Sequence, residues 1–117
     1  MKLYVAPRAP NPRRVQMFLA EKGIDPAAAG IERIDVDLNA QEHKGAAFRA
    51  KSPLARVPAL ELDDGRVLTE TRAICTYLEG LHPEPNLMGR DATERAFIEM
   101  ADRRVEWYFM LPIGNCI

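Results

Sequence analysis

The sequence predicts an α/β fold, in which helices cover a four-stranded mixed sheet and one further long helix follows. Three observations support this prediction. Short segments with the two-residue alternation of strands take turns along the chain with segments of helical spacing. A turn sequence joins the last two strand segments, and a proline-rich segment precedes the final helix. The 117 residues suffice for one domain and part of a second.

The first strand and the first helix are expected near the start of the chain. Residues 2–6 have the alternating pattern of a short strand. The helix is predicted over residues 12–22, with Asn11 as its N-cap and Pro12 at its first position, where a missing N–H costs nothing. Gly23 can adopt the left-handed conformation that ends a helix.

The second strand is predicted over residues 32–38, after a loop. Apolar Ile34, Val36 and Leu38 alternate there with charged residues, as in a strand that is buried on one face. Residues 40–50 predict a short, irregular helix, because a glycine interrupts the helical pattern and a Ser-Pro pair follows.

A β-hairpin and a third helix follow. Strands are predicted over residues 57–62 and 66–69, joined by a turn at residues 63–65 in which Gly65 can adopt a positive φ. The helix is expected over residues 70–81, where apolar side chains recur at helical spacing.

The last helix differs from the others because apolar side chains lie on more than one of its faces. Asp91 and Glu94 have the spacing of a capping box at its start, and the helical pattern continues to Leu111. Such a helix is expected to have neighbours on both sides. We therefore expect the chain to end inside a second, all-helical region.

The order of these elements, β-α-β-α-β-β-α over residues 1–82, predicts a thioredoxin-like sheet. A right-handed βαβ unit supplies two parallel strands, and the hairpin adds two antiparallel ones. The predicted organisation is a domain at residues 1–82, a linker at residues 83–90, and the first helix of a truncated helical domain at residues 91–117.

Composition excludes several classes of protein. The 16 basic and 17 acidic residues give a net charge of −1, so a general nucleic-acid binder is not expected. No segment approaches the ~18 apolar residues of a membrane span, and no signal-peptide core precedes Arg8. Cys75 and Cys116 lack zinc or CxxC spacing, so no metal site is expected. The expected location is the cytosol.

Six sequence blocks follow one another along the chain: KLYVAP from residue 2, PNPRRV from residue 10, LAEKGI from residue 19, EHK from residue 42, SPLARVPAL from residue 52 and ETRAICTYL from residue 70. Together, at these spacings, they resemble the glutathione S-transferase family, in its branch without a catalytic tyrosine or cysteine. The resemblance implies glutathione as cosubstrate and a fairly apolar, electrophilic small molecule as second substrate.

The resemblance implies that Pro58 is cis and that Val57 binds the cysteinyl part of glutathione through its main chain. A cis turn leaves a main-chain edge unpaired, and a peptide-like ligand can pair with it. Without the resemblance, a trans proline at the start of an ordinary strand would be favoured, since only about 5–6% of X-Pro bonds are cis.

The resemblance also implies which residues bind the two ends of glutathione. Thr71 would bind the α-carboxylate of the γ-glutamyl end at a helix N-terminus, while Glu70 would meet its ammonium group. A plain capping pair, in which Thr69 or Thr71 closes the helix, is an equal alternative. His43, Lys44 and Arg56 would face the glycine carboxylate. For His43 and Lys44, the alternative is a solvated helix face.

The sequence departs from the family where a residue should activate the thiol. Ala9 stands at the position of the catalytic serine, and Tyr4 lies inside a strand, where sheet packing is expected. Asn11 could donate a hydrogen bond to the thiolate, although a role as helix N-cap accounts for it equally well.

Three functions therefore stay open. The chain could be a glutathione transferase, of low activity because the second-substrate wall is missing. It could be a non-catalytic glutathione-binding domain, as Ala9 favours, or a glutathione-dependent disulfide reductase. The apolar last helix further predicts a homodimer. Cys75 is expected to be an inert core residue, and Cys116 to be exposed.

Overall fold

The chain forms two compact units, Met1–His82 and Pro83–Ile117, in a computed structural model that describes the backbone of residues 1–116 and the side chains of residues 1–113. The first unit contains the sheet, and the second is helical. None of the described helices is both long enough and apolar enough to span a membrane.

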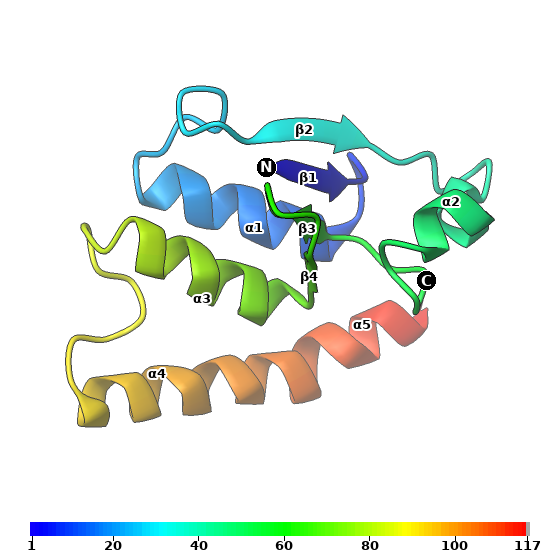
Figure 1. The fold of residues 1–117 in the computed structure, drawn as a ribbon. Helices are drawn as coiled ribbons and strands as arrows, with labels where there is room; N and C mark the ends of the chain where they lie inside the picture. Colours follow the sequence, from blue (N-terminus) through cyan, green and yellow to red (C-terminus); the bar gives the residue numbers. More distant parts are fainter. Residues whose placement is uncertain (117) are drawn as a thin grey trace. The chain divides into compact units, whose positions relative to one another are not determined.

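The sheet of the first unit has four strands in the order β2-β1-β3-β4 (Figure 1). Strand β1 (Lys2–Val5) runs parallel to β2 (Glu32–Asp35) and antiparallel to β3 (Ala59–Glu61). Strand β4 (Val67–Thr69) pairs antiparallel with β3. The predicted mixed, thioredoxin-like sheet is therefore confirmed.

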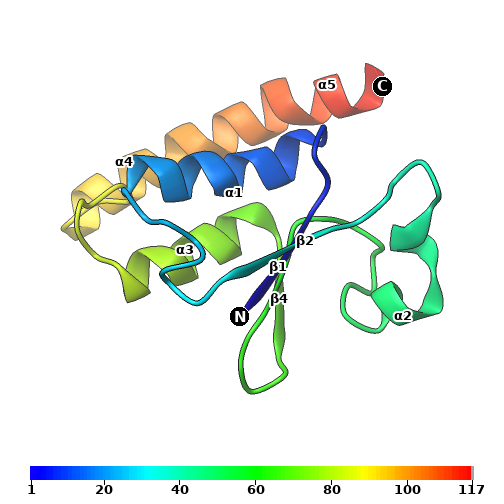
Figure 2. The same ribbon diagram turned by 90° about the horizontal axis from the view of Figure 1, so that it is seen from above.

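Helices cover both faces of this sheet (Figure 2). Helices α1 (Pro10–Glu21) and α3 (Thr71–Leu81) pack side by side on one face. The other face carries the 3₁₀ helix η1 (Glu42–Lys44) and the short α2 (Ala46–Arg49). The irregular helix predicted over residues 40–50 is thus present as two pieces, separated by Gly45.

Each face of the sheet has its own apolar core, because successive strand residues point to opposite sides. The buried residues of the strands and helices on the α1–α3 side are Leu3, Val5, Val15, Leu19, Leu60, Ile74, Cys75 and Leu78. Under α2 lies a smaller cluster of Tyr4, Val36, Phe48 and Ala59. Cys75 is buried, as expected for a core residue.

The start of α1 differs from the prediction. The helix begins at Pro10, and its N-cap is Ala9, so Asn11 is not the N-cap. The physical reason is that Pro10 fits the first helical position as well as Pro12 does, and the helix takes the earlier of the two. The predicted end is confirmed: Gly23 has φ 69° and its N–H donates to the Ala20 carbonyl at 3.0 Å.

The strands are shorter than predicted, while their alternation holds. The ladder of β2 ends at Asp35, and the Val36 N–H makes one more bond, to the Val5 carbonyl at 2.7 Å. Beyond it the chain leaves the sheet toward η1. At the hairpin, Gly65 has φ 90°, as its predicted role in the turn requires.

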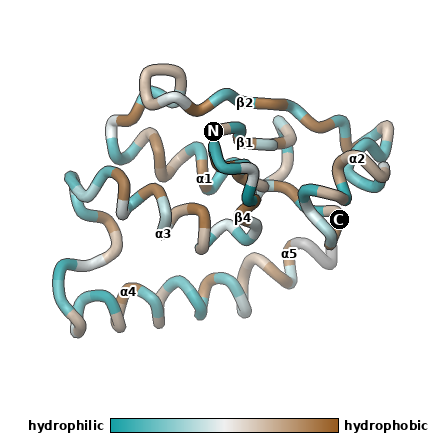
Figure 3. Tube along the Cα trace, in the orientation of Figure 1, coloured by the Kyte–Doolittle hydropathy of each residue, from teal (hydrophilic) through white to brown (hydrophobic). Residues whose placement is uncertain are grey.

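The second unit is one run of helix after an irregular start. It consists of α4 (Ala92–Val105), a single π-helical stretch η2 (Glu106–Met110), and α5 (Leu111–Cys116). The Asp91 carboxylate accepts from the Glu94 N–H at 2.8 Å, which confirms the predicted cap. Apolar and polar residues alternate along α4 (Figure 3). The side chain of Cys116 lies outside the described residues.

Candidate functional site

Four segments meet at one end of the sheet, where β1, β2 and β4 finish and β3 begins. The register places Tyr4 beside Ala59, and Ala59 beside Thr69. The segment that follows β1 therefore lies near two others: the residues just before β3 and the residues just after β4. This arrangement brings together the start of α1, the main chain before Ala59, and the start of α3. The predicted residues Asn11, Val57, Pro58, Glu70 and Thr71 lie in these segments.

The main chain at Val57 is open to a ligand. The Val57–Pro58 peptide bond is cis, as the family resemblance implied. Pro58 is buried and Val57 is half-buried. Within the described part of the chain, neither the N–H nor the carbonyl of Val57 makes a hydrogen bond. An unpaired edge of this kind can pair with an extended peptide-like ligand.

The segment before Val57 is held in an unusual conformation by Ser52. The Ser52 hydroxyl donates to the Arg56 carbonyl at 2.8 Å and accepts from the Arg56 N–H at 3.2 Å. Ala55, between them, has φ 56°, a left-handed conformation that costs a non-glycine residue about 1 kcal/mol or more. The side chain of Arg56 is exposed beside Val57.

The start of α3 has unpaired hydrogen-bond donors. Glu70, its N-cap residue, has φ 73° and ψ 122°, and its side chain makes no capping hydrogen bond. Thr71 is 8% exposed, and its hydroxyl has no hydrogen bond among the described residues. The N–H groups of Thr71 and Ala73 are likewise unpaired there. Free N–H groups at a helix start favour a carboxylate.

The start of α1 offers few hydrogen-bond donors. Of its first three positions only Asn11 has an N–H group, because Pro10 and Pro12 have none. The Asn11 side chain is exposed, and its Oδ1 accepts from Arg14 at 3.2 Å. The Nδ2 group of Asn11 is therefore left as the donor.

The basic residues predicted to bind a carboxylate lie on the segment between β2 and β3. His43 belongs to η1 and is half-buried, whereas Lys44 is exposed, as on a solvated face. The Nδ1 atom of His43 is buried and makes no hydrogen bond. A buried polar atom without a hydrogen-bond partner is uncommon in folded proteins.

A network next to the site joins Tyr4, Lys51 and Glu61. The Tyr4 hydroxyl donates to Glu61 Oε2 at 3.0 Å, and Lys51 Nζ donates to Glu61 Oε1 at 2.9 Å. Burial, then the bond to Glu61, raises the pKa of Tyr4. Hydrogen bonds from Lys51 and Tyr4 lower the pKa of Glu61, and the bond to Glu61 raises the pKa of Lys51. Sequence analysis missed Lys51 and Glu61, because no local spacing links them.

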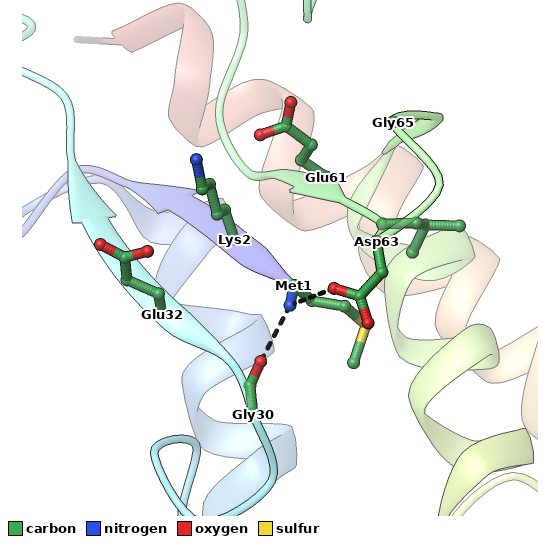
Figure 4. A pocket seen from close by; sticks show the side chains of 8 residues that line it. Met1, Lys2, Gly30, Glu32, Glu61, Asp63 and Gly65 are labelled. Atoms are coloured by element: carbon green, nitrogen blue, oxygen red, sulfur yellow. Dashed lines mark hydrogen bonds and ion pairs between the residues drawn. The ribbon is translucent and has the colours of Figure 1, made fainter.

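A separate pocket lies at the opposite end of the sheet (Figure 4). It has a volume of about 400 Å³ and is lined by Met1, Lys2, Gly30, Glu32, Glu61, Leu62, Asp63 and Gly65. The amino group of Met1 donates there to the Gly30 carbonyl and to Asp63, both at 2.9 Å. None of the predicted site residues lines this pocket. Among the side chains that the structure describes, no three His, Cys, Asp or Glu residues are grouped to hold a metal ion.

Comparison with known proteins finds one family over most of the chain, the family that the sequence blocks resemble. Residues 3–86 match the sequence model of the glutathione S-transferase N-terminal domain. The chain is 35% identical to glutathione S-transferase 2 of Saccharomyces cerevisiae, over 97% of this chain and 48% of that protein. It is 38% identical to maleylacetoacetate isomerase of Pseudomonas aeruginosa, over 82% of this chain and 44% of that protein.

A solved structure agrees in both sequence and fold. A glutathione S-transferase domain-containing protein from Marinobacter aquaeolei is 42% identical, with a TM-score of 0.90 over 97% of this chain and 54% of that chain. The present chain thus spans about half the length of the relatives that it matches. With the domain match, the fold and the open edge at Val57 in agreement, the chain belongs to the glutathione S-transferase family.

Proposed function

We propose that this chain binds glutathione at the end of the sheet and serves as the glutathione-binding part of a glutathione transferase. The observation that carries the proposal is the unpaired main chain of Val57, together with the unpaired N–H groups of Thr71 and Ala73 at the start of α3. Residues 1–82 would form the glutathione-binding domain, residues 83–90 the linker, and residues 91–117 the first helix of a helical domain. The place of action would be the cytosol.

Each part of glutathione has a counterpart in the site. The Val57 N–H and carbonyl would pair with the cysteinyl main chain, next to buried Pro58. Thr71 and the free N–H groups of α3 would bind the α-carboxylate of the γ-glutamyl end, with Glu70 at its ammonium group. His43 and Arg56 would bind the glycine carboxylate, since a cation at hydrogen-bond distance is the usual partner of that group.

The reaction would be an attack of the glutathione thiolate on an electrophile. A free thiol has a pKa of about 8.5, so hydrogen-bond donors near the sulfur are needed to favour the thiolate at neutral pH. Asn11, at the start of α1, supplies an amide donor there. Positioning of the thiolate against an apolar electrophile would provide most of the remaining rate enhancement.

Isothermal titration of the 117-residue chain with glutathione tests the proposal directly. We expect saturable binding, together with conjugation of an aryl halide that is slower than in relatives of about twice the length. Absence of binding at millimolar glutathione would contradict the proposal, because every role named above requires the bound tripeptide.

Isomerisation is a second candidate, favoured by the 38% identity to a maleylacetoacetate isomerase. A thiolate that adds to a conjugated double bond and then leaves regenerates glutathione, whereas conjugation consumes it. Measurement of glutathione before and after turnover separates the two reactions.

Ala9, which has no hydroxyl, favours a third candidate, glutathione binding without turnover. Glutathione-dependent reduction of a small disulfide is a fourth outcome that the same assays would detect.

A further inference from the structure

The segment between β2 and β3 carries half of the proposed site but has little apolar anchoring. Among residues 37–56, only Phe48 and Ser52 are buried. Ser52 bonds to the main chain of Arg56, inside the same segment. Phe48 inserts into the apolar cluster under α2, and only the half-buried Leu38 and Val57, near the two ends of the segment, also pack against that cluster. Such a segment needs another attachment to the sheet in order to hold His43 and Arg56 in place.

That attachment is the network centred on Glu61. The Glu61 carboxylate extends from β3 and accepts one bond from Tyr4 of β1 and one from Lys51, which directly precedes Ser52. In the described part of the chain, Lys51–Glu61 is the one ion pair that joins residues 37–58 to the sheet. The side chain of Glu61 is 19% exposed and that of Lys51 is 36% exposed, so the pair is shielded in part.

Tyr4 connects this polar attachment to the apolar one. Its ring meets the Phe48 ring edge-on, with the centroids 5.8 Å apart. The Lys51 ammonium group lies over the same ring, 5.9 Å from its centroid. A single buried side chain of β1 thus contacts both anchors of the segment, through an aromatic pair and a cation–π contact.

We propose that Tyr4, Lys51 and Glu61 are positioning residues, which form a polar anchor that holds residues 42–56 for the glycine end of glutathione. Val57 is held separately, because it packs against the apolar cluster and precedes buried Pro58. The inference rests on the proposed function, because the role of His43 and Arg56 depends on bound glutathione. The anchor acts through the segment: Lys51 fixes Ser52, and Ser52 fixes the main chain of Arg56. It predicts a loss of affinity confined to ligands that carry the glycine.

The experiment compares two ligands, glutathione and γ-glutamylcysteine, which lacks the glycine. In Glu61→Gln and Lys51→Met, the Kd for glutathione is expected to rise about fivefold, whereas the Kd for γ-glutamylcysteine stays unchanged. Lys51→Arg, which keeps the cation, should bind glutathione like the wild-type chain. Asp64→Asn is the matched control, because it removes a carboxylate from an exposed ion pair with Arg66 on the same hairpin.

Amide hydrogen exchange on the ligand-free chains tests the anchor independently of glutathione. Exchange over residues 42–56 should become faster in Glu61→Gln and stay unchanged in α1. Equal weakening of both ligands, or unchanged exchange over residues 42–56, would overturn the inference. If the wild-type chain binds neither ligand, the proposed function fails, and the exchange rates alone decide whether the anchor holds the segment.

Discussion

Thr71 combines burial with an unused hydroxyl, and among the described residues its own N–H group and that of Ala73 are also unpaired. Thr71→Ala is expected to weaken glutathione binding about tenfold, because a hydrogen bond to a charged group contributes about 1.5–3 kcal/mol. Isothermal titration measures the effect. Thr76→Ala is the control, since Thr76 is exposed on the same helix and its hydroxyl donates to the Arg72 carbonyl at 2.9 Å. An equal loss in the control would point to damage to α3 rather than to a lost ligand contact.

Asn11 is the one amide donor at the start of α1, and Arg14 occupies its oxygen. Asn11→Ala should shift the pH midpoint of thiolate formation by bound glutathione upward by about 1, since a donor to the thiolate is lost. Ultraviolet absorbance of the thiolate against pH provides the measurement. Gln16→Ala, on the same helix, serves as the control. An unchanged midpoint in Asn11→Ala would remove Asn11 from the proposed site.

At the residue level, sequence motifs indicate candidate site positions, whereas the contacts around them are visible only in the folded chain. Val57, Pro58, Glu70 and Thr71 were named from motifs, and the strand order then places them at one end of the sheet. The contacts of Glu61 with Tyr4 and Lys51 could not be predicted, because they join residues 57 and 10 positions apart in the chain. Pairings of that kind depend on the register of strands, which no local pattern determines.

Among the helices, α1 and α3 are joined by an ion pair between Lys22 and Glu79, whose side chains are 0% and 13% exposed. Lys22→Ala is expected to lower the free energy of unfolding by about 3 kcal/mol, since it leaves the Glu79 carboxylate buried without its cation. Urea unfolding measures this change. Arg103→Ala removes an exposed pair with Glu99 and should change stability by less than about 0.5 kcal/mol. Similar losses in both variants would contradict the role of burial.

Most elements were predictable because their patterns are local. The alternation in β2 and the glycine at the hairpin turn are visible within a few residues. The start of α1 was placed two residues late, because two prolines offered equivalent first positions. The short length of α2 could be predicted, because Gly45 interrupts the helical pattern. The burial of α2 through Phe48 is visible only in the packed structure.

For the folded unit as a whole, the Glu61 network predicts a two-sided pH profile. The pKa of Glu61 is lowered on folding, so its stabilisation is complete above the ordinary carboxyl pKa of about 4.3 and is lost as the pH falls further. The pKa values of Lys51 and Tyr4 are raised, so their contribution is complete below about 10 and is lost as the pH rises. Urea midpoints at several pH values should show both losses. Glu61→Gln should flatten the acid side, and an unchanged acid side would contradict this origin.

The second unit carries large apolar side chains on the surface of its helix. Phe97 is 63% exposed, Trp107 60%, Tyr108 82% and Phe109 60%. Apolar surface of this extent is typical of an interface, so we propose that the 117-residue chain forms a homodimer. Light scattering at micromolar concentration should give the mass of two chains, and Phe97→Glu should shift the mass toward one. A single-chain mass for the wild type would contradict the proposal.

The two prolines at the start of α1 have a consequence for engineering. Where most helices could present three main-chain donors to a bound sulfur, this one presents a single donor, that of Asn11. The reactivity of a thiol held there is therefore open to adjustment by design. Replacing the residue at position 12 by one with an N–H group would add a donor without introducing any new side-chain chemistry, so nucleophile strength could be tuned from the backbone alone.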